Sequence, residues 1–429
     1  MFGGGQQGAG GAEFEGSPES GNAIQGPGVG KSTGEGDVCT MKYGRPLQPR
    51  WMCGLALALL GCQSSPALVT PPAPLPESGA IEATVFLIGD AGKSPPTGDP
   101  VLSTLGRMVR EDPGRTTVVF LGDNVYPSGI PAESDPGRHA AEQRLGAQID
   151  VVDTTVAHGI FVPGNHDWAA SGDDGWEAVR RQERLIAQRG RPSVVMLPGG
   201  GCPGPVVVDI GTKLRLVVLD TEWWLRSGAK PVRPGSGCSP NTIGGVVDSL
   251  RATLRDAGDR HVGVVSHHPL ASGGIHGGHF GILDHLFPLR AWKSWLWVPL
   301  PVIGSAYPIA RMSGISSQDL TSSAFGVMRD SLGSAFRARR PLFYAAGHEH
   351  NLQVLDGERV AHFLVSGGGY YGHTTRVVHL DESRYAAAES GFMRVDVLRD
   401  GRVRLGTITV TANGNATEAF SMWLVSAPM

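Results

Sequence analysis

Five short motifs that contain carboxylate, amide, phenol or imidazole side chains occur in order along the chain. They are Gly89-Asp90-Ala91-Gly92, Gly122-Asp123-Asn124-Val125-Tyr126, Gly164-Asn165-His166-Asp167, Ser266-His267-His268-Pro269 and Gly347-His348-Glu349-His350. Hard divalent and trivalent cations prefer oxygen ligands and neutral imidazole. Together the motifs supply enough donors for two adjacent metal ions, and such a pair indicates hydrolysis of a phosphate ester.

Seven side chains of these motifs are the candidate metal ligands: Asp90, Asp123, Tyr126, Asn165, His267, His348 and His350. A glycine precedes Asp90, Asp123, Asn165 and His348, and it lets the chain turn sharply beside an ion. His348 and His350 are two positions apart, so on an extended backbone they point apart and can serve different ions. We expect Asp123 to bridge the two ions at the separation of about 3.5–4 Å that is typical of two-metal sites.

Each motif follows an apolar run that is typical of a buried strand. The runs are 84–88, 117–121, 160–163, 262–265 and 342–346, with another at 214–219. Helical patterns lie between them, at about 101–111, 138–157, 174–189 and 245–257. Strands that end in polar residues place those residues along one edge of a sheet, where α/β folds build their sites. Three further runs, 392–397, 403–410 and 420–425, predict a C-terminal β layer. The pattern predicts a four-layer α/β/β/α sandwich.

The order of the motifs resembles that of the calcineurin-like metallophosphoesterase superfamily. Within it, the closest resemblance is to the purple acid phosphatases of the tartrate-resistant type. Most of the superfamily begins with Asp-x-His, whereas this chain has Asp90-Ala91-Gly92. Tyr126 stands where purple acid phosphatases carry the phenolate ligand of a ferric ion. The resemblance covers about residues 84–370 and implies the metallophosphoesterase type of sandwich.

The resemblance implies an acid phosphatase-like hydrolase of phosphate monoesters with two metal ions, Fe(III) beside Fe(II), Zn(II) or Mn(II). The ferric ion would be held by Asp90, Asp123, Tyr126 and His350, and the divalent ion by Asp123, Asn165, His267 and His348. His268 would be a neighbour of the site and not a ligand.

The same resemblance assigns histidines to the substrate. His166 matches the histidine that contacts phosphate, and His276 and His279 lie where relatives place a histidine near the leaving group. Of these two we prefer His276. Metal-bound hydroxide would attack phosphorus, and a histidinium, His166 or His276, would protonate the departing oxygen. No nucleophilic side chain is needed, and the sequence has no Gly-x-Ser-x-Gly motif.

Two other functions use the same residues. The metals could serve a phosphodiesterase or a hydrolase of nucleotides or phospholipid head groups. A second alternative is a non-catalytic surface lipoprotein that kept the fold for binding. The segment of about 281–335 falls outside the resemblance and contains Trp292, Trp295 and Trp297. It is either a lid or membrane-contacting element or an insertion that packs its tryptophans on the body, and we expect the latter.

The N-terminal residues predict export. Residues 1–40 are rich in glycine and poor in large apolar residues, so they cannot build a core. Residues 41–61 contain a basic flank and a short apolar run that ends before Cys62, as in a bacterial lipoprotein signal peptide. A buried helix over 51–60 is the weaker interpretation. Because signal peptides normally begin a protein, we expect Met41 to be the true start and residues 1–40 to be a mis-called extension.

This signal predicts a lipidated Cys62, a Ser/Pro-rich tether over 62–80 and a catalytic domain over 81–429. The protein would be a membrane-anchored lipoprotein that faces the periplasm or the cell exterior. Cys202 and Cys238 remain in the exported body, and either a disulfide or two free thiols fits the sequence. The net charge of -3 gives no electrostatic case for nucleic-acid binding.

Overall fold

The computed structural model describes residues 71–95, 98–291 and 295–429. The predicted leader and signal peptide, Cys62 and Trp292 lie outside these residues. The described residues fall within one compact unit that runs from Gln63 to Met429. Within them, no helix combines the length and the apolar character that crossing a membrane requires.

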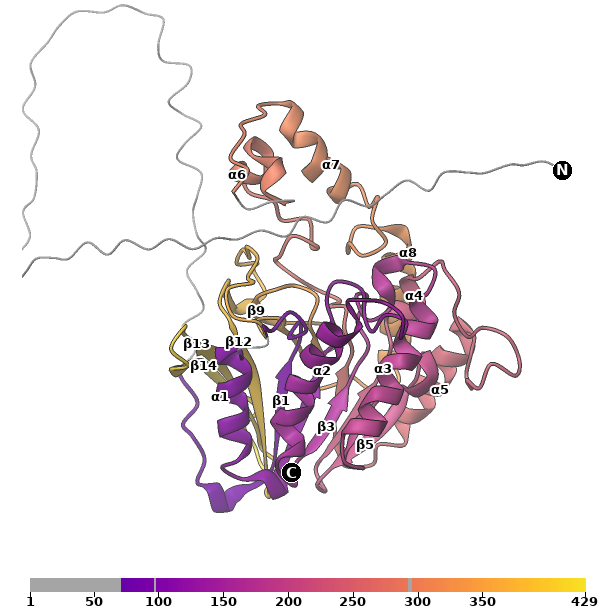
Figure 1. The fold of residues 1–429 in the computed structure, drawn as a ribbon. Helices are drawn as coiled ribbons and strands as arrows, with labels where there is room; N and C mark the ends of the chain where they lie inside the picture. Colours follow the sequence, from indigo (N-terminus) through magenta and orange to yellow (C-terminus); the bar gives the residue numbers. More distant parts are fainter. Residues whose placement is uncertain (1–70, 96–97, 292–294) are drawn as a thin grey trace, which may run out of the picture. The chain divides into compact units, whose positions relative to one another are not determined.

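The described residues form two sheets of seven strands each (Figure 1). The first has the order β14-β13-β12-β1-β2-β3-β4, and the second has the order β11-β9-β10-β8-β7-β6-β5. The strands of the first are β1 (Ile81–Ile88), β2 (Thr116–Phe120), β3 (His158–Phe161), β4 (Val194–Met196), β12 (Gly391–Leu398), β13 (Val403–Val410) and β14 (Ala416–Val425). Those of the second are β5 (Val206–Ile210), β6 (Leu214–Val218), β7 (His261–Val265), β8 (Phe343–Ala346), β9 (Leu352–Asp356), β10 (His362–Ser366) and β11 (Ser383–Ala387).

The inner strands of both sheets run parallel. In the first sheet β1, β2, β3 and β4 pair in parallel, and β12 joins β1 in antiparallel register. In the second sheet β6, β7, β8 and β10 pair in parallel. The carboxyl ends of parallel strands therefore meet at one edge of each sheet, as the motif positions predict.

Helices cover the outer face of each sheet. The longer ones are α1 (Pro100–Val109), α2 (Arg138–Asp153), α3 (Gly175–Arg189), α5 (Ile243–Arg255) and α8 (Ser323–Phe336). The shorter α-helices are α4 (Glu222–Leu225), α6 (Ile282–Leu286) and α7 (Ala306–Met312). Short 3₁₀ turns are η1 (Ser78–Ala80), η2 (Pro113–Arg115), η3 (Ala169–Ser171), η4 (Gly199–Gly201), η5 (Pro288–Ala291) and η6 (Ile303–Ser305).

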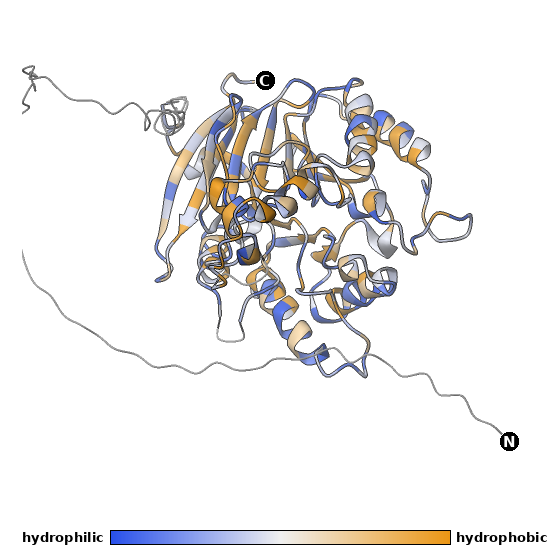
Figure 2. Cartoon of the chain, turned by 90° about the horizontal axis from the view of Figure 1, so that it is seen from above, coloured by the Kyte–Doolittle hydropathy of each residue, from blue (hydrophilic) through white to orange (hydrophobic). Residues whose placement is uncertain are grey.

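Alternating side chains of the strands face different layers. In β1, Phe86 and Ile88 pack with α1, α2 and α3, whereas Val85 and Leu87 pack against the second sheet. A third cluster joins the second sheet to α4, α5 and α8. In Figure 2, hydrophobic residues colour much of the strands of the sheets. Three apolar layers between four layers of structure confirm the predicted α/β/β/α sandwich.

Residues 282–291 and 295–315, here called the tip, stand away from the sheets. They contain α6, η5, η6 and α7, and Figure 1 shows α6 and α7 apart from the sandwich. The chain then returns to the outer helical layer in α8, where Phe325, Met328 and Leu332 are buried. The predicted insertion of about 281–335 thus contains a projecting part and a helix of the sandwich.

Cys202 and Cys238 form a disulfide with a Cα–Cα distance of 5.4 Å. The bridge joins the segment before β5 to the loop that leads into α5. Of the two alternatives that the sequence leaves open, the structure has the disulfide.

Candidate dinuclear metal centre

The candidate ligands lie just beyond the carboxyl ends of five parallel strands. Asp90 follows β1, Asp123 follows β2, Asn165 follows β3, His267 follows β7 and His348 follows β8. Three of these five residues have positive φ angles, which are uncommon for residues other than glycine: 62° at Asp90, 54° at Asp123 and 69° at His348. Such conformations cost about 1–3 kcal/mol each and concentrate at functional sites.

Gly122 shows why a small residue precedes the second motif. Its φ is 92°, and a Cβ at this position would lie 2.5 Å from Nδ1 of His267. Any larger residue would therefore displace the imidazole, and glycine lets the strands of the two sheets approach here.

The hydroxyl of Tyr126 is the centre of the first group of donors. Its Oη lies 3.1 Å from Oδ1 of Asp90, 3.1 Å from Oδ2 of Asp123 and 3.0 Å from Nε2 of His350. Nε2 of His350 is also 3.4 Å from Oδ1 of Asp90. These are the four residues that the resemblance assigns to a ferric ion.

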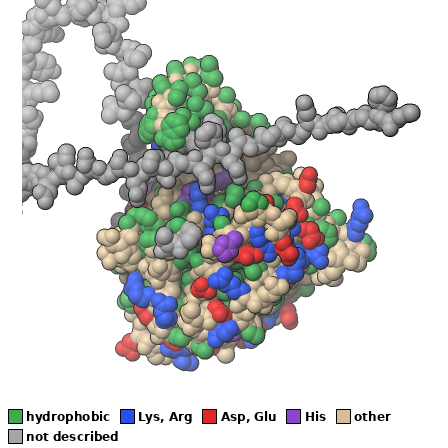
Figure 3. Space-filling view, viewed as in Figure 1, with side chains coloured by type: hydrophobic (Ala, Val, Ile, Leu, Met, Phe, Trp, Pro, Cys, Tyr) green, Lys and Arg blue, Asp and Glu red, His purple; other side chains and the backbone are tan. Residues whose placement is uncertain are grey.

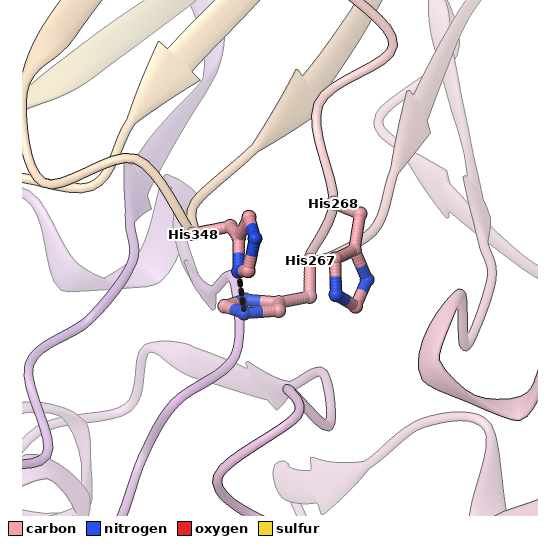
Figure 4. Close-up of side chains that lie close together, drawn as sticks. All are labelled: His267, His268 and His348. Atoms are coloured by element: carbon pink, nitrogen blue, oxygen red, sulfur yellow. Dashed lines mark hydrogen bonds between the residues drawn. The ribbon is translucent and has the colours of Figure 1, made fainter. Parts of the chain in front are cut away.

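Asn165 is the centre of the second group. Its Oδ1 lies 3.0 Å from Nε2 of His267 and 3.1 Å from Nδ1 of His348. The two imidazole nitrogens are 3.3 Å apart, and Figure 4 shows their rings meeting at this contact. Nε2 of His267 is also 3.4 Å from Oδ1 of Asp123. These four residues are the set assigned to the divalent ion.

Asp123 belongs to both groups through different oxygens. Its Oδ2 contacts Tyr126 in the first group, and its Oδ1 lies beside His267 in the second. When two ligand atoms each lie about 2.1 Å from an ion and subtend a right angle there, they are about 3 Å apart. Most of the donor–donor distances given above are close to this value. The geometry is that of a carboxylate able to bridge two ions.

The chemistry of the donors also fits cations. Asp90 and Asp123 are each 1% exposed, and no lysine or arginine of the described residues forms an ion pair with either. Buried carboxylates without basic partners are costly unless a proton or a metal ion compensates their charge. Oxygen atoms of Asp90 and Asp123 and a nitrogen of His267 lie within 4.8 Å of one another, close enough to share an ion.

Hydrogen bonds orient the ligand rings. Nδ1 of His267 is 2.8 Å from the carbonyl oxygen of Leu121, which directs Nε2 into the site. Nε2 of His348 is 3.1 Å from the carbonyl oxygen of Gln318, which leaves Nδ1 for the second group. Such contacts fix the tautomer of a ligand histidine.

His268 stays outside both groups. Its Nδ1 contacts Oγ1 of Thr221 at 2.8 Å, and its Nε2 contacts Oε1 of Gln318 at 2.7 Å. In Figure 4 its ring lies apart from the contact between His267 and His348. Although His268 is near enough to form a metal group with these two, both of its nitrogens are engaged elsewhere.

Charges within the site shift the pKa values of its members. Burial raises the pKa of Asp123, but the positive charges of His267 and His166 outweigh burial and hold this pKa below its usual range. Burial lowers the pKa of His267, yet Asp123 overcomes that effect and raises it to about 10. Burial, assisted by His276 and His268, holds the pKa of His348 well below its usual value. A cation that binds here must therefore displace a proton from His267.

A pocket of 260 Å³ opens over the donors. Its lining comprises Asp123, Asn165, His166, His276, Arg311, Ser316, Gln318, His348 and His350. His279 is not among these residues. A larger cavity of 580 Å³ lies at the amino ends of the strands, beside Glu82, Thr116 and His158, away from every candidate ligand.

Two of the three histidines predicted to contact the substrate, His166 and His276, flank the site. His166 packs beside Tyr126 with ring centres 4.3 Å apart, and its Nε2 is 3.8 Å from Oδ2 of Asp123. His276 packs beside His348 with ring centres 4.0 Å apart. The pocket therefore has one histidine over each group of donors.

Three polar residues at or just after the tip complete this wall, and sequence reasoning did not identify them. Arg311 and Gln318 line the pocket. Asp319 is buried, accepts hydrogen bonds from Arg311 at 2.5 Å, and has Oδ1 2.9 Å from Nδ1 of His276. All three lie outside the motifs; the polar composition of residues 316–319 could have suggested Gln318 and Asp319, but no sequence signal pointed to Arg311.

Glu349 and Asp167 hold the motif loops in place. Glu349 is buried and accepts hydrogen bonds from Ser272 and from the backbone N–H groups of His276 and Gly277. Asp167 accepts from the backbone N–H groups of Asn124, Val125 and Gly164. Acidic residues of the motifs thus also serve as anchors.

No protein-family model matches the sequence, and a search of curated proteins gives no match. Among solved structures, GAP50, the anchor in the inner membrane complex of Plasmodium, is 13% identical, with 81% of this chain and 90% of that chain covered and a TM-score of 0.47. Purple acid phosphatase PPD1 from yellow lupin (Lupinus luteus) seeds is 15% identical over 80% of this chain and 53% of that chain, with a TM-score of 0.49. PhoD is 10% identical over 84% and 74%, with a TM-score of 0.46. Likenesses of this size leave the chemistry to be inferred from the site itself.

Proposed function

We propose that this protein is a dinuclear metal-dependent phosphatase that hydrolyses phosphate monoesters. The observation that carries the proposal is the position of Asp123, whose two carboxylate oxygens each face a separate group of donors. One group offers Asp90, Tyr126 and His350, and the other offers Asn165, His267 and His348. A pocket of 260 Å³ above both groups has room for a phosphate group.

Two bound cations would neutralise the charge of the phosphate ester and lower the pKa of the attacking water. Tyr126 favours a trivalent ion in the first group. Burial, with the charges of Asp123 and Asp90, raises the pKa of its phenol well above the usual value. Bound as phenolate, this side chain would suit Fe(III) in the first group, whereas the amide and imidazole donors of the second group would suit Fe(II), Zn(II) or Mn(II).

His166 and His276 are the proton-carrying groups that face the substrate. Nδ1 of His166 is 2.5 Å from the carbonyl oxygen of Pro127, so Nε2 faces the pocket. Nδ1 of His276 is bound by Asp319, which directs its Nε2 away from that carboxylate. A histidine held in this way can give a proton to the departing alcohol oxygen, and we assign that role to His276.

Export and lipid attachment at Cys62 are also part of the proposal. The Cys202–Cys238 disulfide supports export, since such bridges persist in oxidising compartments. Radiolabelled fatty acid incorporation that requires Cys62 would test the anchor. Labelling that persists in Cys62→Ser would contradict it.

The direct test is hydrolysis of p-nitrophenyl phosphate by the purified protein, together with metal analysis. Activity should disappear after chelation and return with iron, zinc or manganese. Asp123→Asn should lose both metals and activity, whereas Asp256→Asn, whose side chain is 92% exposed, should retain both. A protein that keeps its metals but hydrolyses no phosphate ester would instead be the non-catalytic surface lipoprotein.

A further inference from the structure

The tip carries an unusual concentration of exposed apolar side chains. Of the 20 large hydrophobic residues that are exposed in the described part of the chain, 11 lie between Ile282 and Ile315. Val302 is 89% exposed, Ile303 75% and Trp295 72%. Figure 3 shows hydrophobic side chains gathered over the α6–α7 region. The expectation that these tryptophans pack on the body is wrong for Trp295 and Trp297.

The charge pattern of the tip is that of an element at a lipid interface. Residues 295–310 contain no charged side chain. Arg290 precedes this run and stacks on Trp297, with its guanidinium carbon 3.9 Å from the ring centre. Tryptophan and arginine favour the boundary between lipid tails and head groups, where an apolar ring is buried and a cation meets phosphate.

Val302, the most exposed of these large hydrophobic residues, is also strained. Its φ is 69° and its ψ is -59°, and the N–H of Ile303 reaches the carbonyl oxygen of Pro301 at 2.8 Å. A branched side chain is rare in such a γ-turn. Strained residues concentrate at functional positions, and here the turn presents Val302 and Ile303 to the outside, as expected of side chains that serve an external surface.

A second cavity of 340 Å³ lies at the base of the tip. Its apolar walls include Phe280, Leu283 and Phe287, and Arg290 and Arg376 also line it. Neither arginine forms an ion pair with another described residue, although Asp284 shares the cavity. The combination of apolar walls and two cations suits an anionic amphiphile.

This cavity and the catalytic pocket share a wall. Ile275 lines the cavity, and its neighbour His276 lines the catalytic pocket. On α7, Tyr307 lines the cavity and Arg311, one turn later, lines the catalytic pocket. The hydroxyl of Tyr307 is 2.9 Å from Nη1 of Arg311. A molecule that places a phosphate in the catalytic pocket and an apolar chain in the cavity would contact both of these pairs of residues.

We infer that the tip docks on a lipid bilayer and presents the catalytic pocket to phosphate monoesters carried by lipids. The substrate class rests on the proposed phosphatase function, whereas docking does not. A bilayer is favoured over a second copy of the chain because the tip joins an uncharged, tryptophan-containing surface to arginines suited to anionic head groups. Lipidation at Cys62, as proposed above, would also hold the protein at a membrane.

The test uses the full chain with Cys62→Ser, so that no acyl anchor contributes. The tip variant adds Trp295→Ser, Val302→Ser and Ile303→Ser, none of which lines the catalytic pocket. The matched control adds Val156→Ser, Val207→Ser and Ile243→Ser, which change exposed apolar residues of the body (62%, 40% and 42% exposed). Binding is measured with vesicles of phosphatidylcholine and phosphatidylglycerol in equal parts. Bromine-labelled acyl chains report contact, because they quench Trp297, which both variants retain.

The tip variant should bind vesicles at least about tenfold more weakly than the control, since three large apolar side chains no longer enter the lipid. Quenching of Trp297 should fall in parallel. Hydrolysis of phosphatidate in the vesicles should fall with binding, and hydrolysis of soluble p-nitrophenyl phosphate should be equal in all proteins.

Equal vesicle binding by the tip variant and the control would overturn the docking inference. The docking inference would also be overturned if the control protein formed a dimer and did not bind vesicles, and if the tip substitutions dissociated that dimer. The tip would then contact a second copy of the chain. Normal turnover of the soluble ester without turnover of vesicle-borne phosphatidate would overturn the substrate class. Tip-dependent binding without hydrolysis of any ester would support docking and overturn the phosphatase function.

Discussion

Oδ1 of Asp319 lies 2.9 Å from Nδ1 of His276, and the two residues come from opposite sides of the tip. The same carboxylate accepts two hydrogen bonds from Arg311. One buried acid thus holds both a histidine and an arginine of the catalytic pocket. This relationship makes Asp319 a positioning residue for the reaction.

Asp319→Asn should lower kcat for p-nitrophenyl phosphate by about 10–100-fold, the usual effect of removing a group that orients a functional histidine. KM should change little, because the metal ligands are untouched. The double variant with His276→Asn should be no slower than His276→Asn alone, since the two residues act as one unit. If the two substitutions lowered kcat multiplicatively, the coupling between Asp319 and His276 would be contradicted. Asp284→Asn, which changes an acid within the tip, is the matched control.

Asp319 should also make stability depend on pH. Burial raises its pKa, but hydrogen bonds from Arg311 and His276 outweigh burial and lower the pKa from 3.8. The ion pair therefore contributes stability above the unfolded pKa and loses that contribution as the pH falls through the depressed folded pKa. The difference in free energy of unfolding between wild type and Asp319→Asn should shrink as the pH falls from neutrality to below 3.8. Urea unfolding at a series of pH values measures it, and a constant difference would argue against the ion pair.

Tyr126→Phe should abolish a visible charge-transfer band from tyrosinate to iron. The hydroxyl of Tyr126 contacts three other ligands of the first group, so no other phenol can take its place. Absorption spectra with iron analysis measure the effect, and Tyr370→Phe serves as the control. An active, colourless protein without iron would move the site to a dizinc or dimanganese type.

Reduction of the Cys202–Cys238 bridge should lower the free energy of unfolding by about 3–4 kcal/mol, as expected for a loop of this length. The bridge spans 36 positions. Urea unfolding with and without reductant measures the loss, and the Cys202→Ser/Cys238→Ser variant should not respond to reductant. Two free thiols in the native protein would show that the bridge does not form.

Local sequence identified the parallel strands, and it placed the candidate ligands at the carboxyl ends of those strands, where the structure has them. Asp90, Asp123 and His348 are each placed by the strand and the glycine directly before them, so a short window contains the information. The seven candidates come together as two groups because their strands share one edge of each sheet. Which oxygen of Asp123 faces which group could not be predicted, since this depends on the packing of two sheets.

The wall formed by the tip could not be predicted from local sequence. Arg311 and Asp319 reach the pocket through contacts between distant segments, such as the hydrogen bond from the N–H of Leu320 to the carbonyl oxygen of His276 at 2.9 Å. Composition suggested that tryptophans would be buried, but the structure exposes Trp295 and Trp297. Their environment depends on what meets the tip, and within the described residues no segment covers these two rings.

The carbonyl oxygen of Gln318, 3.1 Å from Nε2 of His348, belongs to the loop that follows the tip. The rotation of an imidazole deep in the protein is therefore fixed by a segment whose other end faces outward. A displacement of that outer end would reach His348, a proposed metal ligand, through only a few residues. Any contact that restricts the motion of the tip would also restrict the orientation of the His348 imidazole.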